Sequence, residues 1–239
     1  MKNMKNTLRT FVKSVGLIVV LSCPAPEAKA VSLAYLLQPN ASITSGNLVF
    51  FGFHNATQHG DLNIPFSEIF VDPIIGGPDA AGTDFGIRFS SSRWSLTAPN
   101  MEYDLGLDFR VRTFSGQPSI TDNTLRFAGG LTGNAMAAVG EAVLDVSGRS
   151  LASKLVFMNG NFQKYVDHKT FRDGPYTEIQ ISKDLAMMTG AQAGSTVTVT
   201  NFDQTFSQVP EGGPGLFATF SLFGILCWAG RGRFRKSTL

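Results

Sequence analysis

The sequence predicts an all-β fold, an antiparallel β-sandwich of jelly-roll or immunoglobulin-like type, from three observations. Apolar and polar residues alternate at a period of two in several short runs, as in strands with one buried and one solvated face. Clusters of Gly, Pro, Asn and Asp separate these runs, and no long capped amphipathic helix interrupts them. Fifteen of the twenty phenylalanines lie between Phe50 and Phe206, and aromatic side chains suit a pleated core.

The clearest strand is YDLGLDFRV, residues 103–111, in which every second residue is apolar. The denser run LVFFGF, residues 48–53, predicts a buried strand. Further strands are expected at residues 85–89, 125–127, 137–144, 155–157, 179–181 and 196–200. Turns are expected between them, at residues 73–77, 82–84, 115–118, 129–130, 133–134, 173–175 and 193–194.

The first thirty residues have the order of a secretory signal peptide. Their basic segment contains Lys2, Lys5, Arg9 and Lys13. The apolar run that follows, residues 14–23, is shorter than the ~20 residues of a membrane-spanning helix. Ala28 and Ala30 form a small-x-small cleavage site, so signal peptidase is expected to cut after Ala30. The alternative is lipoprotein processing at Cys23, where Leu21 is bulky at a position that usually holds a small residue.

The last thirty residues combine a Pro-Glu-Gly-Gly turn, an apolar run and a basic end. Residues 212–230 span about 28 Å as a helix, close to the ~30 Å of a hydrocarbon core, so a transmembrane helix is expected at about residues 215–230. The four cations that follow are Arg231, Arg233, Arg235 and Lys236. Cations beside a span stay in the cytoplasm, which places the body outside the inner membrane. The alternative, a buried core helix, leaves these four cations without partners.

This tail resembles the PEP-CTERM sorting signal of Gram-negative bacteria, in which a Pro-Glu-Pro-type motif precedes one short span and an Arg-rich end. The motif here consists of Val209, Pro210, Glu211, Gly212 and Gly213, with Gly212 in place of the usual second proline. The resemblance implies that an exosortase, a membrane protease-transferase, cuts at the motif and removes the tail. The expected domains are a signal peptide (1–30), a β-sandwich (31–209) and a sorting signal (210–239, with its motif at 210–215 and its basic end at 231–236).

The body also resembles a group of PEP-CTERM proteins that have a β-rich domain and no assigned activity. The matching stretches are residues 47–53, 85–94, 104–105 with Val111, 120–122 with Leu125, Glu141, 182–184 and 204–209. The resemblance implies a β-rich fold and an export address, and it implies no chemistry.

Composition restricts the partners of the body. Residues 31–209 hold eleven Lys and Arg against sixteen Asp and Glu, a net charge of −5, although the whole chain is +2. An acidic body disfavours nucleic acid and anionic membrane surfaces as partners. Both cysteines, Cys23 and Cys227, lie outside the body, so no disulfide, thiolate metal site or cysteine nucleophile is expected in it.

No residue of the body is predicted to form a catalytic, cofactor or metal site. His54 and His59 are five residues apart, which places them on opposite faces of an extended segment, and His168 lies in a polar loop. Asp104 and Asp108 share a strand face but are about 13 Å apart. That separation exceeds the ~5–9.5 Å of a glycosidase carboxylate pair.

Other polar groups give equally weak signals. Glu102 and Asp104 fit a surface charge ladder with Arg110 and Arg112. The Gly/Pro-rich loop that carries Asp72, Asp79 and Asp84 could offer oxygen ligands to calcium, but it lacks EF-hand spacing. Exposed aromatic residues would favour sugar binding, and the candidates are Trp94, Tyr35, Tyr165 and Tyr176. Motifs such as GxSxG, a P-loop, HExxH or GxGxxG in a strand–turn–helix setting are missing from the sequence.

The sequence therefore favours a non-enzymatic, exported protein of the cell envelope or extracellular matrix. Its expected partners are signal peptidase, an exosortase-type protease, the inner membrane as a transient anchor, and exopolysaccharide, with no cofactor and no nucleic acid. The alternative is a carbohydrate- or calcium-binding module at the cell surface, since sandwich folds carry many binding sites. A third hypothesis, a hydrolase, requires a cleft with perturbed carboxylates or histidines.

Overall fold

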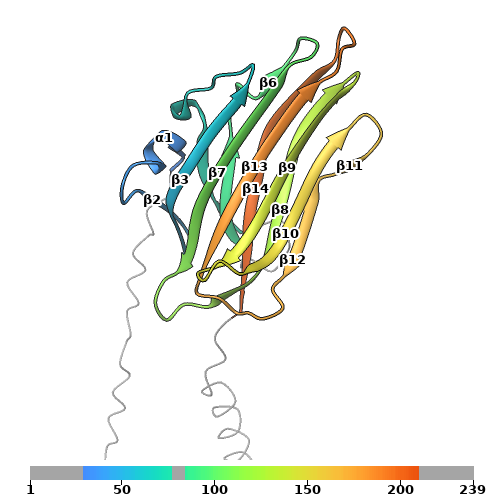
Figure 1. The fold of residues 1–239 in the computed structure, drawn as a ribbon. Coiled ribbons are helices and arrows are strands. Elements are labelled where there is room, and N and C mark those ends of the chain that lie inside the picture. The colour runs from blue at the N-terminus through green and yellow to red at the C-terminus, as the bar shows by residue number, and fades with distance from the viewer. Residues whose placement is uncertain (1–28, 77–83, 210–239) are drawn as a thin grey trace, which may run out of the picture.

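Two antiparallel β-sheets pack face to face in the computed structural model, which describes residues 29–76 and 84–209 (Figure 1). Sheet A has the strand order β1-β4-β5-β14-β8-β12, with β6 also beside β14, and sheet B has the order β11-β10-β9-β13-β7-β3-β2. The described strand pairings are antiparallel. The predicted all-β antiparallel sandwich is thereby confirmed.

The strands of sheet A are β1 (Val31–Ser32), β4 (Phe70–Ile75), β5 (Phe85–Ser90), β6 (Ser95–Leu96), β8 (Ser119–Thr132), β12 (Val166–Thr170) and β14 (Thr196–Val209). The strands of sheet B are β2 (Ser42–Ser45), β3 (Leu48–Gly60), β7 (Glu102–Thr113), β9 (Ala135–Asp145), β10 (Ser150–Asn159), β11 (Gln163–Lys164) and β13 (Glu178–Thr189). Two short helical segments complete the described elements, α1 (Leu33–Leu36) and the 3-10 turn η1 (Phe66–Glu68).

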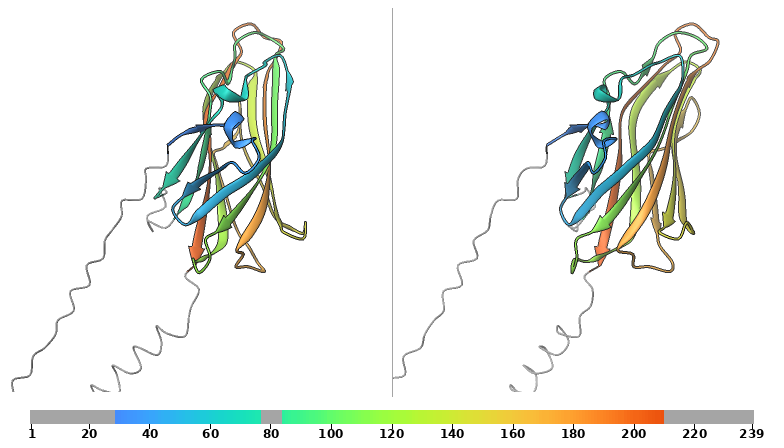
Figure 2. Two further views of the ribbon diagram at one scale, coloured as in Figure 1. Left: turned by 90° about the vertical axis from the view of Figure 1, so that its left-hand side faces the viewer. Right: turned by 60° about the vertical axis from the view of Figure 1, so that its left-hand side comes forward.

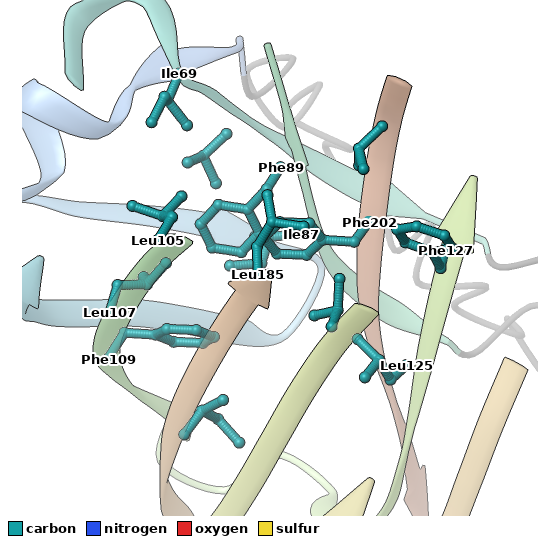
Figure 3. Close-up of a cluster of buried hydrophobic side chains, with 14 of the residues drawn as sticks. Ile69, Ile87, Phe89, Leu105, Leu107, Phe109, Leu125, Phe127, Leu185 and Phe202 are labelled. Carbon is teal, nitrogen blue, oxygen red and sulfur yellow. The ribbon is translucent and has the colours of Figure 1, made fainter. Parts of the chain in front are cut away.

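Alternation decides which face of each strand is buried. In β7 the five apolar residues that the period-two pattern turns inward are all buried, and the polar residues between them are not. The inward side chains of both sheets form one hydrophobic core, in which Phe89, Phe109 and Phe202 come from three different strands (Figure 3). Burial of this apolar surface is the main favourable contribution to folding.

The centre of the core is a stack of aromatic rings. The Phe202 ring lies 4.8 Å from that of Phe89 and 5.5 Å from that of Trp94, centroid to centroid, and both pairs are nearly parallel. The expectation that Trp94 is an exposed aromatic is therefore wrong, because its side chain is completely buried. Trp94 lies in the turn between β5 and β6, and that turn directs the indole inward onto Phe202.

Two predicted turns are strands in the structure. β4 runs through Pro73, which pairs with Ile87 of β5, while β1 covers only Phe70 and Val71 on its other side. Proline has no N–H to donate to a neighbouring strand. Pro73 is tolerated because β1 does not extend alongside it, so no ladder hydrogen bond is lost on that side of β4. β8 runs through residues 129–130, which pair with β14. A side chain at Gly129 would lie only 2.4 Å from the carbonyl oxygen of Thr198 on β14, so this pairing requires glycine at that position. Glycine permits this close approach of two backbones.

The two helical segments close one open edge of the sandwich, between the ends of the sheets (Figure 2). The side chain of Ser32 caps α1 by accepting a hydrogen bond from the backbone N–H of Tyr35 at 3.2 Å. Leu33 and Leu36 of α1 are buried in the common core. Among residues 29–76 and 84–209, neither helical segment is long and apolar enough to span a membrane.

Several predictions lie outside the described residues. They are the signal peptide up to Ala28, the Asp79 loop, and the tail from Pro210 onward, with its transmembrane helix and Arg231, Arg233, Arg235 and Lys236. β1 begins at Val31, directly after Ala30, and β14 ends at Val209. The export and sorting segments stay predictions from the sequence.

Candidate functional site

A pocket of about 440 Å³ lies at one end of sheet B, at the top of Figure 1, where β9 begins and where β10 and β13 end. We call it the Phe162 pocket. It is lined by Asn134, Ala135, Met136, Asn159, Gly160, Asn161, Phe162, Met188, Thr189 and Gly190. Its volume falls within the ~300–1,000 Å³ that is typical of small-molecule sites.

One asparagine shapes the loop that presents Phe162. The side-chain oxygen of Asn159 accepts hydrogen bonds from the backbone N–H groups of Asn161 at 3.0 Å and Phe162 at 2.8 Å. The backbone N–H of Asn159 in turn donates to the carbonyl of Phe162 at 2.9 Å. Asn residues favour such side-chain-to-backbone turns. The turn leaves the Phe162 side chain 70% exposed, the second most exposed large hydrophobic residue among those described.

The floor and the opposite wall come from neighbouring strands. Met136 of β9 pairs with Asn159 of β10 on one side and with Met188 of β13 on the other, so the three side chains form one row. The backbone N–H of Gly190 donates to the carbonyl of Asn134 at 2.5 Å. A side chain at Gly190 would collide with the Asn134 amide at 2.6 Å, so glycine is needed for the wall to close.

The lining chemistry restricts the ligand. The pocket combines an aromatic ring, two flexible thioethers and three carboxamides, and it is lined by no charged residue. Asparagine side chains both donate and accept hydrogen bonds. The oxygen of Asn159 already holds the loop, which leaves its –NH₂ group for a ligand. This arrangement can bind a neutral molecule that has an apolar face and several hydroxyl groups.

The structure brings the predicted histidines to the same face, which corrects the expectation of opposite faces. β3 continues past residue 53 to Gly60, with irregularities in its register between Phe51 and His54 and between His54 and Thr57. Asn55 has a positive φ of 52° within this bulge, and the extra residue changes which side chains point outward. His54 now pairs with Asp108 and His59 with Asp104, both on the outer face of sheet B.

The acidic residues of this face form local contacts. Asp108 accepts a hydrogen bond from the side chain of Asn55 at 2.8 Å, and its carboxylate lies 3.8 Å from Nε2 of His54. Arg110 lies 3.5 Å from Glu178, so the predicted charge ladder includes a residue of β13 that the sequence did not indicate. Arg112 instead packs over the ring of Phe51, 4.7 Å from its centroid.

A carboxyl pair, missed in the sequence, joins β7 to β13. Burial, the negative charge of Asp104 and a hydrogen bond with it raise the pKa of Asp184 above its ordinary value. Asp104 also lines a hollow of about 360 Å³, together with residues that include His59, Glu102 and Met188.

The other predicted candidates are separated from the pocket. His168 lies on strand β12 and not in a loop, and its Nδ1 hydrogen bonds with Oγ1 of Thr124 at 2.9 Å. Asp84 accepts a hydrogen bond from Ser207 at 2.9 Å. Within the described part of the chain, no group of three or more His, Cys, Asp or Glu residues could hold a metal ion.

Of the four predicted aromatic candidates, only two are exposed. Tyr35 and Tyr165 are partly open to solvent, whereas Tyr176 packs against the core and Trp94 lies within it. Phe162 was missed because phenylalanine is normally read as a core residue. Its setting, directly after Asn159-Gly-Asn, is a turn signal that places an aromatic ring at a loop tip.

No protein-family model matches the chain, and no curated protein sequence matches it. Among solved structures, the carbohydrate-binding module TmCBM61 in complex with β-1,4-galactotriose is 13% identical, with 63% of this chain and 87% of that one covered and a TM-score of 0.27. TmCBM27, a mannan-recognising module, is 9% identical, with coverages of 76% and 97% and a TM-score of 0.27. The enzymatically active domain of tailspike protein 4 of bacteriophage CBA120 is 13% identical, with coverages of 73% and 22% and a TM-score of 0.28. Likenesses at this level carry no functional argument, and the site has to be interpreted from its own geometry.

Proposed function

We propose that the domain is a non-catalytic carbohydrate-binding module of an exported protein, and that the Phe162 pocket holds the sugar. The observation that carries this proposal is an exposed aromatic ring beside a pocket that is lined by three asparagines and no charged side chain. The sequence raised a carbohydrate- or calcium-binding module as its alternative, and the proposal keeps carbohydrate binding.

The chemistry of the pocket matches that of a sugar ring. One face of a pyranose is apolar because its C–H bonds point to that side, and such a face packs well on the flat ring of Phe162. The hydroxyl groups at the rim of the sugar both donate and accept, as do the carboxamides of Asn134, Asn159 and Asn161. Met136 and Met188 provide a floor that adapts to the shape of the ligand. The uncharged lining favours a neutral glycan over an anionic one.

Replacing Phe162 with alanine is expected to weaken glycan binding at least about tenfold, the equivalent of ~1.4 kcal/mol, because an exposed aromatic anchor is lost. The measurement is affinity gel electrophoresis of the purified protein in gels that contain galactan, mannan, xylan or glucan. Calorimetry then follows with the polysaccharide that retards the wild-type protein.

Phe114→Ala is the matched control. Phe114 is also exposed, at 47%, but it follows β7 at the opposite end of sheet B from the pocket. This variant should bind like the wild type. Equal retardation of both variants and the wild type would show that Phe162 does not bind the glycan. A wild-type protein that none of the polysaccharides retards would contradict the proposed function.

We also propose, from the sequence alone, that the protein is exported, held briefly in the inner membrane and then released to the cell surface or extracellular matrix. Replacing Pro210 and Glu211 with alanine is expected to leave the protein uncut in the inner membrane, because the exosortase-type protease loses its motif. Cell fractionation with mass spectrometry of the C-terminus measures this. A mature surface form that keeps residues 216–239 would show that the tail is a permanent anchor.

A further inference from the structure

Five polar side chains are enclosed in the otherwise apolar core. Asn123 of β8 and Gln204 of β14 come from sheet A, and Glu141 of β9, Lys154 of β10 and Lys183 of β13 come from sheet B. The side chains of Glu141, Lys154 and Lys183 are completely inaccessible to solvent. Buried charges are costly, and well-packed apolar residues often stabilise a core equally well. The burial of these charged side chains therefore requires a chemical explanation.

Three of these groups touch one another across the gap between the sheets. Nζ of Lys154 lies 2.6 Å from Oε1 of Glu141 and donates to the carboxamide oxygen of Asn123. Nδ2 of Asn123 donates to the same Oε1 at 2.7 Å. An amine, a carboxamide and a carboxylate thus form a closed triangle, and one carboxylate oxygen contacts both nitrogens.

The cluster places two lysines beside a single carboxylate. Burial lowers the pKa of both lysines, and a single carboxylate can balance only one ammonium. Lys183 contacts Oε2 of Glu141, donates to Oε1 of Gln204 at 2.6 Å and lies 5.7 Å from the centroid of the Phe202 ring. These three partners favour Lys183 as the ammonium. The reaction needs Lys154 as a free amine, the nucleophilic form of a lysine, and burial favours that form by lowering the pKa of Lys154.

The carboxylate of Glu141 is ready to act as a base. Burial alone raises the pKa of this group, but the two lysines outweigh that effect and hold it below its ordinary value. Its Oε1 is within hydrogen-bond distance of the nitrogen that would lose a proton and of the nitrogen that would gain one. That is the geometry of a general acid–base group in an amide exchange.

We propose that Lys154 and Asn123 condense into an intramolecular isopeptide bond that ties sheet B to sheet A, with Glu141 as the catalytic residue. Nζ of Lys154 attacks Cγ of Asn123, and Glu141 takes the proton that Nζ gives up. Glu141 then passes this proton to Nδ2, the Cγ–Nδ2 bond breaks and ammonia leaves. The product is a secondary amide between Nζ and Cγ, and the reaction consumes no oxidant, metal or cofactor.

The second lysine and the second carboxamide do not offer the same reaction. Lys183 contacts the oxygen of Gln204, but Nε2 of Gln204 has no hydrogen-bond partner among the described residues. No acid is therefore placed to protonate that nitrogen as a leaving group. Asn123 is the carboxamide whose leaving nitrogen touches the carboxylate.

The test is peptide mapping of the full-length protein, denatured, digested with trypsin and analysed by mass spectrometry. We expect one branched peptide that contains both Asn123 and Lys154, with a mass about 17 Da below the sum of its two parts because one ammonia is lost. Trypsin should no longer cut after Lys154. On a denaturing gel the uncut chain should migrate faster than an unlinked one.

Lys154→Met should abolish the branched peptide. The variant keeps Glu141 paired with Lys183, so it should still fold, and circular dichroism checks this. Asn123→Ala should give the same result with all charged groups retained. Lys164→Met is the matched control, because Lys164 lies at the surface on β11. The cross-link should persist in this variant, in a branched peptide that extends to Lys169 because trypsin loses its cut after residue 164.

Two results would overturn the proposal. One is a folded wild-type protein that is cut after Lys154 and yields the Asn123 peptide by itself at its full mass. The other is a branched peptide that joins Lys183 to Gln204 and persists in the Lys154→Met variant.

Discussion

Replacing Phe202 with alanine is expected to lower the free energy of unfolding by about 3–5 kcal/mol, the range for large aromatic side chains in closed cores. Phe202 is fully buried, and its ring is stacked between those of Phe89 and Trp94. Both neighbours lose a packing partner, and the rigid sandwich cannot collapse to fill the space. Urea denaturation of the purified protein measures the effect, and the midpoint should fall by roughly 2 M at an m-value of about 2 kcal/mol/M.

Phe162→Ala serves as the stability control for this variant. It removes the same number of atoms from an exposed ring, so its midpoint should stay close to that of the wild type. The pair also separates the two roles of phenylalanine in this protein, one in the core and one in the pocket. A Phe202→Ala protein with an unchanged midpoint would show that the aromatic stack is not part of the cooperative core.

Replacing Glu141 with leucine is expected to cost about 3–5 kcal/mol, because it leaves two buried lysines without their counter-charge. The loss should depend on pH. Burial holds the pKa of Lys154 and Lys183 below the ordinary 10.5, so between the two values the unfolded chain binds more protons than the folded one. The stability of the variant should therefore rise with pH towards 10.5, as measured by urea denaturation at a series of pH values.

The triple variant Glu141→Leu, Lys154→Met and Lys183→Met is the matched control. It removes all three charges together, and replacement of a whole buried ion cluster by apolar residues is often neutral or stabilising. It should be clearly more stable than Glu141→Leu alone. Neither protein can form the proposed isopeptide bond, so their difference reports the charges only. Equal stabilities at pH 7 would contradict the electrostatic account.

The period of two predicted most of the fold, because it reports directly which face of a strand is wet. Residues 103–111 became the central part of β7, with each apolar residue inside. The rule failed where backbone contacts decide. Gly129 and Pro73 are residue types that are typical of turns, yet Gly129 lies in β8 beside β14 and Pro73 lies in β4 beside β5. The bulge at Asn55 likewise shifted His59 to an unexpected face, and no local sequence pattern indicates its register.

The buried cluster could have been found from the sequence by parity. Glu141 has the same parity as Val139 and Val143 in β9, and Lys183 has that of Ile181 and Leu185 in β13. A charged residue on the apolar parity of a strand is a signal in its own right, because it must find a partner in the core. The identity of that partner depends on the opposite sheet, and only the structure brings Asn123 to Lys154. The Phe162 pocket depends in the same way on three loops that are distant in sequence.

The position of β14 determines how many hydrogen bonds carry a force that is applied to the C-terminal end of the domain. This last strand lies in the interior of sheet A, bonded to β5 on one side and to β8 on the other, and its final residue Val209 pairs with Ser119. β1, at the other end of the chain, is a two-residue strand at the edge of the same sheet. Hydrogen bonds of antiparallel strands run perpendicular to the strands, so a pull on Val209 along β14 loads many of them at once. β1 contributes only the pairs Val31–Val71 and Ser32–Phe70, so a pull along β1 loads far fewer bonds than a pull along β14.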